Sequence, residues 1–124
     1  MKIRTLITAK KAIISFMQEK MSPKLSYKLM KFLSEIETEE NFFNEKVREI
    51  INVYGEKDDS GELIVIDNKI KIQECSEEDC NRAFFELESV EVESPSIRFT
   101  IDELSELRLS IEDMIALNAF IVEE

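Results

Sequence analysis

Acidic side chains and two cysteines are the main residues of this sequence that could do chemistry, because its 124 residues include no histidine. Histidine is the commonest general base and metal ligand, and it completes the Ser-His and Cys-His nucleophile pairs. The chain also has only two glycines, too few for a Gly-x-x-x-x-Gly-Lys-Ser/Thr or Gly-x-Gly-x-x-Gly phosphate loop. The composition therefore argues against the common hydrolase and nucleotide-binding mechanisms.

Two acidic clusters could in principle bind a hard divalent cation through carboxylate oxygens. They are Asp58-Asp59 and Glu77-Glu78-Asp79, and neither follows the spaced Asp-x-Asp-x-Asp-Gly loop with its terminal glutamate. Asp58-Asp59 is explained by solvation of a turn, and Glu77-Glu78-Asp79 by the helix dipole, which favours acids in the first turn of a helix. A glycosidase acid pair would also need aromatic platforms for the sugar, and the chain has no tryptophan. We therefore expect no metal site, no cofactor, no catalytic residue and no enzymatic activity.

The two cysteines, Cys75 and Cys80, stand five residues apart with acidic residues between them. This spacing matches neither a redox Cys-x-x-Cys motif nor a zinc ligand pair backed by further ligands. A helix that begins near Ser76 would leave Cys75 outside and Cys80 inside, so a disulfide would need favourable geometry. We expect a structural role for these thiols.

Basic and acidic residues are segregated along the sequence. The net charge is -11, yet residues 1–34 carry eight lysines and arginines against one acid, which gives +7. Residues 35–124 therefore carry -18. Such a distribution can steer a charged partner, and it also fits a plain solvated surface that keeps a small protein soluble.

Nucleic acid could contact this chain only through the basic N-terminal part. Lys24, Lys28 and Lys31 would share one helical face there, but the acidic remainder would repel a phosphate backbone. Direct nucleic-acid binding is therefore not expected. An acidic surface could instead occupy the phosphate-binding groove of another protein and exclude nucleic acid from it.

Two helices are predicted in the first half of the chain. Residues 8–21 show one apolar face, with Thr8 as N-cap, and Ser22-Pro23 then turns the chain. Residues 24–54 contain neither glycine nor proline and predict one long amphipathic helix, which would reach about 46 Å at roughly 1.5 Å per residue. Its apolar stripe is interrupted at Glu40, so either the helix changes phase or it breaks and Thr38 caps a second helix.

The second half of the chain predicts short strands and helices. After Gly55, residues 63–66 and 69–72 indicate a β-hairpin, and residues 77–88 a helix. Residues 90–93 and 97–99 indicate a second strand pair, and short helices should begin at Thr100 and Ser110. The fold class is therefore α+β: a helical hairpin in residues 1–55 with one long helix, and a small mixed module with β-hairpins and short helices in residues 56–124, packed on it as one folding unit.

Adjacent phenylalanines could provide contacts with another protein. Phe42-Phe43 and Phe84-Phe85 occupy neighbouring helical positions, so one ring of each pair can lie off the core face, unless the buried face is broad. An aromatic ring outside the core would suit a dimer or a partner helix. The candidate partner-binding residues are Glu77, Glu78, Glu91, Glu93, Phe43 and Val47.

Three parts of the sequence carry a resemblance to known proteins: residues 53–63 after the long helix, residues 101–117 and the Met1-Lys2-Ile3 start. Together they resemble a family of small acidic proteins of unknown function. Its members occur in bacteriophages and prophages of Gram-positive bacteria. The family has no assigned catalytic residues, and the resemblance implies a phage origin. Small phage proteins commonly work by binding another protein.

The sequence thus predicts a non-enzymatic interaction factor whose acidic surface binds a basic host or phage protein. One such partner is a nucleic-acid-binding protein of a host-defence system, which the chain would inhibit. The alternative is a phage morphogenesis accessory, in tail or other assembly, that oligomerises through its long helix as a homodimer or larger. No apolar run of signal-peptide or membrane-spanning length follows the start, so we expect the bacterial cytoplasm and no membrane.

Overall fold

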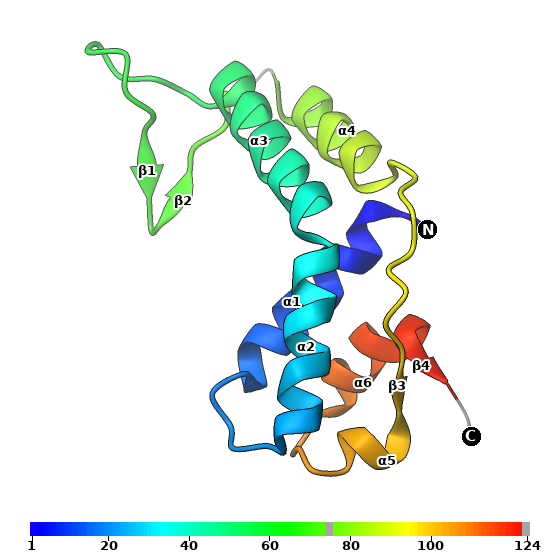
Figure 1. Cartoon of the computed structure of the whole chain (residues 1–124). Coiled ribbons are helices and arrows are strands. Elements are labelled where there is room, and N and C mark those ends of the chain that lie inside the picture. The colour runs from blue at the N-terminus through cyan, green and yellow to red at the C-terminus, as the bar shows by residue number, and fades with distance from the viewer. Residues whose placement is uncertain (74–75, 123–124) are drawn as a thin grey trace.

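Helices form most of the structure, a computed structural model that describes residues 1–73 and 76–122 (Figure 1). Six α-helices and two two-stranded sheets lie in this part of the chain, so the expected α+β class is confirmed. The elements are α1 (Ile3–Phe16), α2 (Pro23–Glu35), α3 (Glu37–Tyr54), β1 (Val65–Ile66), β2 (Lys69–Ile70), α4 (Glu77–Glu88), β3 (Phe99–Thr100), α5 (Ile101–Leu104), α6 (Ile111–Leu117), the 3-10 helix η2 (Asn118–Phe120) and β4 (Ile121–Val122).

The hydrophobic core lies in one part of the molecule, which we call the lobe: α1, α2, β3, α5, α6, η2 and β4. Phe32 from α2 is fully buried there, with its ring 5.8 Å from Phe99 and 4.9 Å from Phe120, centroid to centroid. Buried residues of the lobe come from both halves of the sequence, because α6 packs against α1. Burial of apolar surface in this cluster is the main stabilising term of the fold.

The helix predicted over residues 24–54 is not continuous, since α2 ends at Glu35 and α3 begins at Glu37. Ile36 separates them with φ -96° and ψ 0°, and its side chain is buried in the lobe core. Thr38 does not cap α3, because Ile36 holds the N-cap position and Thr38 lies inside the helix. The interruption of the apolar stripe at Glu40 has a structural cause: the Glu40 carboxylate pairs with the ammonium of Lys10 on α1.

The first helix begins earlier than predicted, at Ile3 rather than near Thr8, and ends at Phe16. Its start is fixed by a distant segment, because the Ile3 N–H donates to the carbonyl of Val90 at 2.8 Å. Ile3 is also fully buried, which extends the apolar face toward the N-terminus. The Ser-Pro turn behaves as predicted: the Ser22 hydroxyl accepts from the Leu25 N–H at 3.3 Å and starts α2.

The predicted β-hairpin is present, although its paired strands are shorter than expected. Asp67 and Asn68 join β1 to β2 with φ values of 52° and 64°, as a two-residue primed turn requires. Gly55 precedes this ribbon and allows close packing, since a Cβ there would lie 2.5 Å from the Ile51 carbonyl oxygen and 2.6 Å from Leu63 Cδ2.

The second strand pair was predicted wrongly. Residues 90–93 and 97–99 do not pair with each other; β3 instead pairs in parallel with β4, from the C-terminal end of the chain. Burial of Phe99 in the lobe favours this distant partner. Helix α4 has the predicted bounds, and α5 and α6 begin with capping boxes at Thr100 and Ser110, as predicted.

Candidate protein-interaction surface

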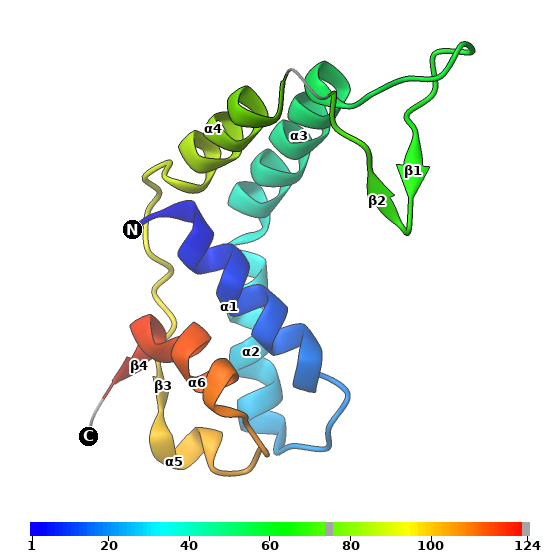
Figure 2. The ribbon, with the colours of Figure 1, turned by 180° about the vertical axis from the view of Figure 1, so that it is seen from behind.

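Helices α3 and α4 extend away from the lobe as a two-helix arm, with α4 running back alongside α3 (Figures 1 and 2). We call these two helices the arm. None of the 18 residues of α3 is buried, and α4 buries only Cys80 and Leu87. By contrast, the 14-residue α1 buries six residues. The arm is therefore a helix pair without a complete core.

The apolar residues of α3 fall into two groups. Phe43, Val47, Ile50 and Tyr54 recur at steps of four, three and four, are half-buried, and form what we call the inner face. Phe42 and Val53 lie beside this face with 39% and 63% of their surface exposed. An amphipathic helix of a folded domain usually buries its apolar stripe, but α3 presents apolar surface that the other described residues leave uncovered.

An exposed row, the open flank, runs along α3 through Phe42, Lys46, Glu49 and Val53. The Lys46 ammonium lies 3.1 Å from a Glu49 carboxylate oxygen and 5.8 Å from the centroid of the Phe42 ring. Both charged side chains are about half exposed to solvent, so the pair adds little stability. The flank thus has an apolar residue at each end and a neutralised ion pair in the middle.

The arm is strongly acidic, with five acids against two bases in α3 and five acids against one base in α4. The acids gather at its two ends. Glu37, Glu39 and Glu40 form the first turn of α3 next to the lobe, where α4 ends with two more glutamates. The first turn of α4, at the outer end, carries three acids. The three bases, Lys46, Arg48 and Arg82, lie between these ends.

The four glutamates predicted to bind a partner do not form one patch. Glu77 and Glu78 are exposed in the first turn of α4, where Glu78 lies 3.8 Å from Arg82. Glu91 and Glu93 follow the other end of α4, which spans about 18 Å at 1.5 Å per residue. Glu91 accepts a 2.9 Å hydrogen bond from the N-terminal ammonium, which lowers the pKa of its carboxyl.

Phe43 and Val47, also predicted to bind a partner, share the inner face of α3. The sequence predicted that one ring of the Phe42-Phe43 pair could lie off the core face, but the residue chosen as a contact was Phe43, and Val53 was not chosen at all. The available signal was the four, three, four spacing of the open flank, which runs parallel to the inner face.

The segregation of charge along the sequence is partly cancelled in space. Lys10 pairs with Glu40 of α3, and the Lys28 ammonium lies 2.8 Å from Glu103 of α5. Lys28 also donates to the Arg98 carbonyl at 2.7 Å, so it does not extend a basic face together with Lys24 and Lys31. Acids from the later part of the chain thus neutralise part of the basic N-terminal segment.

The Lys28–Glu103 contact predicts a specific pH dependence of stability. Hydrogen bonding from Lys28, opposed by partial burial, lowers the pKa of Glu103 below its usual 4.5, so its contribution is present above pH 4.5 and lost as pH falls through the folded pKa. Glu103→Gln should therefore cost about 1–2 kcal/mol at pH 7 and clearly less at pH 2, measured by urea unfolding. The exposed Glu19→Gln is the control and should change nothing; an equal Glu103→Gln deficit at both pH values would contradict the prediction.

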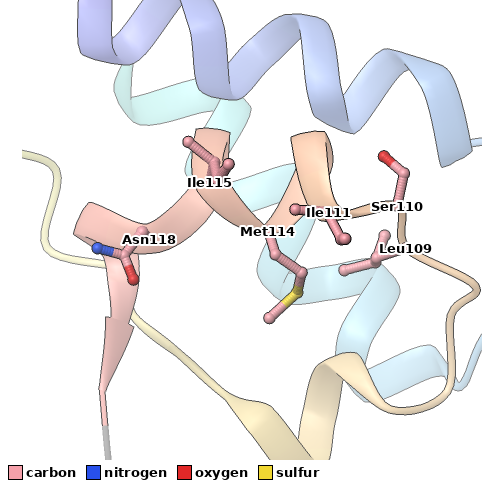
Figure 3. Close-up of a pocket in the computed structure, with 6 residues that line it drawn as sticks. All are labelled: Leu109, Ser110, Ile111, Met114, Ile115 and Asn118. Carbon is pink, nitrogen blue, oxygen red and sulfur yellow. The ribbon is translucent and has the colours of Figure 1, made fainter.

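A separate hollow of about 360 Å³ lies on α6, where Leu109, Ser110, Ile111, Met114, Ile115 and Asn118 line it (Figure 3). Ile111 and Ile115 are 81% and 71% exposed at its rim. The Ser110 hydroxyl accepts the Asp113 N–H as the helix cap. The lining residues include no titratable group, so this hollow suits contact with an apolar group rather than acid–base chemistry.

Cys80 is buried on α4, and desolvation raises the pKa of its thiol, which disfavours the reactive thiolate. Cys75, the other cysteine, lies outside the described residues, and so does the question of a disulfide between the two. Across residues 1–73 and 76–122, no group of three or more histidine, cysteine or acidic side chains could hold a metal ion. No helix in those same ranges is long and apolar enough to cross a membrane.

Comparisons with protein-family models, with curated proteins and with solved structures gave no match to this chain. The arm itself is therefore the guide to function, through its incomplete core, its exposed apolar residues and its acidic ends.

Proposed function

We propose that this chain is a non-enzymatic protein-interaction factor whose acidic arm binds a basic protein. The observation that carries the proposal is α3, an 18-residue amphipathic helix without a buried residue. A helix that projects from a complete lobe and keeps its apolar residues half-covered gains stability when another protein covers them. In keeping with the resemblance to phage and prophage proteins, the expected setting is a bacterial host cell.

The charge of the arm supports a basic partner. Ten carboxylates against three cations create a negative potential that speeds the approach of a basic surface and disfavours acidic ones. The partner class we propose is a nucleic-acid-handling protein, because its phosphate-binding groove is basic. An arm seated in such a groove would exclude nucleic acid, which would inhibit a defence system that depends on it.

Affinity capture at two salt concentrations tests this function. The tag belongs at the C-terminal end, because the N-terminal ammonium bonds to Glu91 and to the Val92 carbonyl. From a nuclease-treated bacterial lysate, the chain should retain a basic nucleic-acid-binding protein at low salt and lose it at high salt.

Charge-reversed variants provide the specificity test for that capture. Glu77→Lys with Glu78→Lys should abolish it, and Glu91→Lys with Glu93→Lys should weaken it less, because Glu91 is already neutralised by the N-terminus. Glu19→Lys, on the lobe, is the matched control. Retention of the same protein at every salt concentration and by every variant would refute the acidic-arm proposal.

The second candidate function is a phage morphogenesis accessory that oligomerises through α3. The half-buried inner face favours it, because a second copy could cover these residues in a helical bundle. It predicts a dimer or larger in light scattering, which Phe43→Ala with Val47→Ala would dissociate. It also predicts capture of phage structural proteins regardless of salt.

A further inference from the structure

We propose that the open flank of α3 is the docking surface for a basic amphipathic helix of the partner. This inference rests on the proposed function and specifies the contact through which it would act. The open flank consists of Phe42, Lys46, Glu49 and Val53, as defined above.

The spacing of the exposed residues fits a helical ligand. Phe42 and Val53 are eleven residues apart, about 16 Å along the helix axis. They lie on the same side of α3 and are 39% and 63% exposed. A helix lying along α3 would meet both with anchors about three turns apart, as in helix-in-groove recognition. The half-buried Phe43 and Ile50 adjoin this row and would extend the contact.

The charge pattern decides between a basic ligand and a second copy of the chain. Acids gather at both ends of the arm, so two arms packed side by side would place acidic ends together in either the parallel or the antiparallel orientation. Like charges brought together in this way repel and oppose self-pairing. A helix with lysines or arginines beside its apolar face would instead meet Glu45 and Glu49, which are exposed next to Phe42 and Val53.

Lys46 gives the proposal a distinctive consequence. Its ammonium lies 3.1 Å from Glu49 and sits near the Phe42 ring, so it competes with an incoming cation for both groups. Lys46→Gln should therefore tighten the binding of a basic helix about threefold, since it frees one carboxylate and removes one repulsive charge. A role of Lys46 in stability alone would not produce tighter binding.

A synthetic peptide tests the surface directly and takes the place of the natural partner. The probe is an 18-residue leucine–lysine amphipathic helix with a fluorophore, and its leucine–glutamate counterpart is the negative control. Fluorescence anisotropy with the full chain should show binding of the lysine peptide, weakened at high salt, and none of the glutamate peptide. Phe42→Ala with Val53→Ala should weaken binding about tenfold or more, and Glu45→Gln with Glu49→Gln should reduce both affinity and salt dependence.

The chain offers a matched control for the apolar variant. Ile111→Ala with Ile115→Ala removes two even more exposed side chains from α6 and should leave peptide binding unchanged. Equal loss in both double variants, or no loss in the Phe42 and Val53 variant, would overturn the open flank as the docking surface. Circular dichroism of each variant verifies that the helices remain folded.

Two further outcomes separate this inference from the proposed function. If sedimentation shows a dimer that the Phe42 and Val53 substitutions dissociate, a second copy occupies the flank and the inference is wrong. A second outcome is that substitutions in the open flank leave peptide binding unchanged, while Glu77→Lys with Glu78→Lys still abolishes capture from the lysate. In that case the proposed function stands, but its contact lies at the outer end of the arm.

Discussion

Replacing Phe32 by alanine is expected to lower the free energy of unfolding by about 3–5 kcal/mol. The Phe32 side chain is fully buried, and its ring contacts those of Phe99 and Phe120 at the centre of the lobe. The substitution leaves a cavity between three segments that are distant in sequence. Urea unfolding followed by circular dichroism would measure the loss.

The same substitution on the arm provides the comparison. Phe43→Ala removes an identical side chain from a half-buried position on α3, so its cost should be about 1–2 kcal/mol. The contrast measures how far stability is concentrated in the lobe. Equal costs at the two positions would show that the arm has a core of its own, and that the inner face of α3 is already used within the chain.

Local signals in the sequence were enough to predict several elements. The starts of α5 and α6 follow from capping residues that lie three residues from the N–H groups they bond. Helix α4 follows from the three acids of its first turn, which the helix dipole favours. The turn at Asp67 and Asn68 follows from the same kind of short-range preference. Each of these features is decided by neighbours along the chain.

The features that could not be predicted depend on contacts between distant segments. The start of α1 is set by the bond from Ile3 to Val90, and β3 pairs with a strand at the far end of the chain. The interruption at Glu40 was visible in the sequence. The ion pair that Glu40 forms was not visible, because it depends on where Lys10 lies in the folded protein. Tertiary contacts thus override the local pattern at these positions.

In the candidate surface too, local patterns could be predicted from the sequence and the effects of tertiary packing could not. Periodicity placed Phe43 and Val47 on one face of a helix, as the structure has them. It could not show that Phe42 and Val53 are the more exposed residues, since their exposure depends on how α4 packs against α3. Net charge predicted an acidic surface, but only the fold shows that the acids gather at the two ends of the arm.

Replacing Val47 by proline is expected to disrupt the arm while the lobe stays folded. Val47 lies in the interior of α3, where proline removes a backbone hydrogen bond and clashes with the preceding turn, at a cost of about 3 kcal/mol or more. Among the described residues, the lobe core takes no member from α3 or α4. Hydrogen exchange should therefore show loss of protection in both arm helices and retained protection in α1, α2 and α6.

Val47→Ala is the control for that substitution, because it also shortens the side chain but keeps the backbone bond and favours helix. It should leave exchange in the lobe unchanged and affect the arm only slightly. Loss of the lysine peptide's binding in Val47→Pro, with the lobe still protected, would locate the interaction on the arm. If the lobe instead lost protection together with the arm, the two would form one cooperative unit, and the view of the arm as an appendage that a partner completes would be wrong.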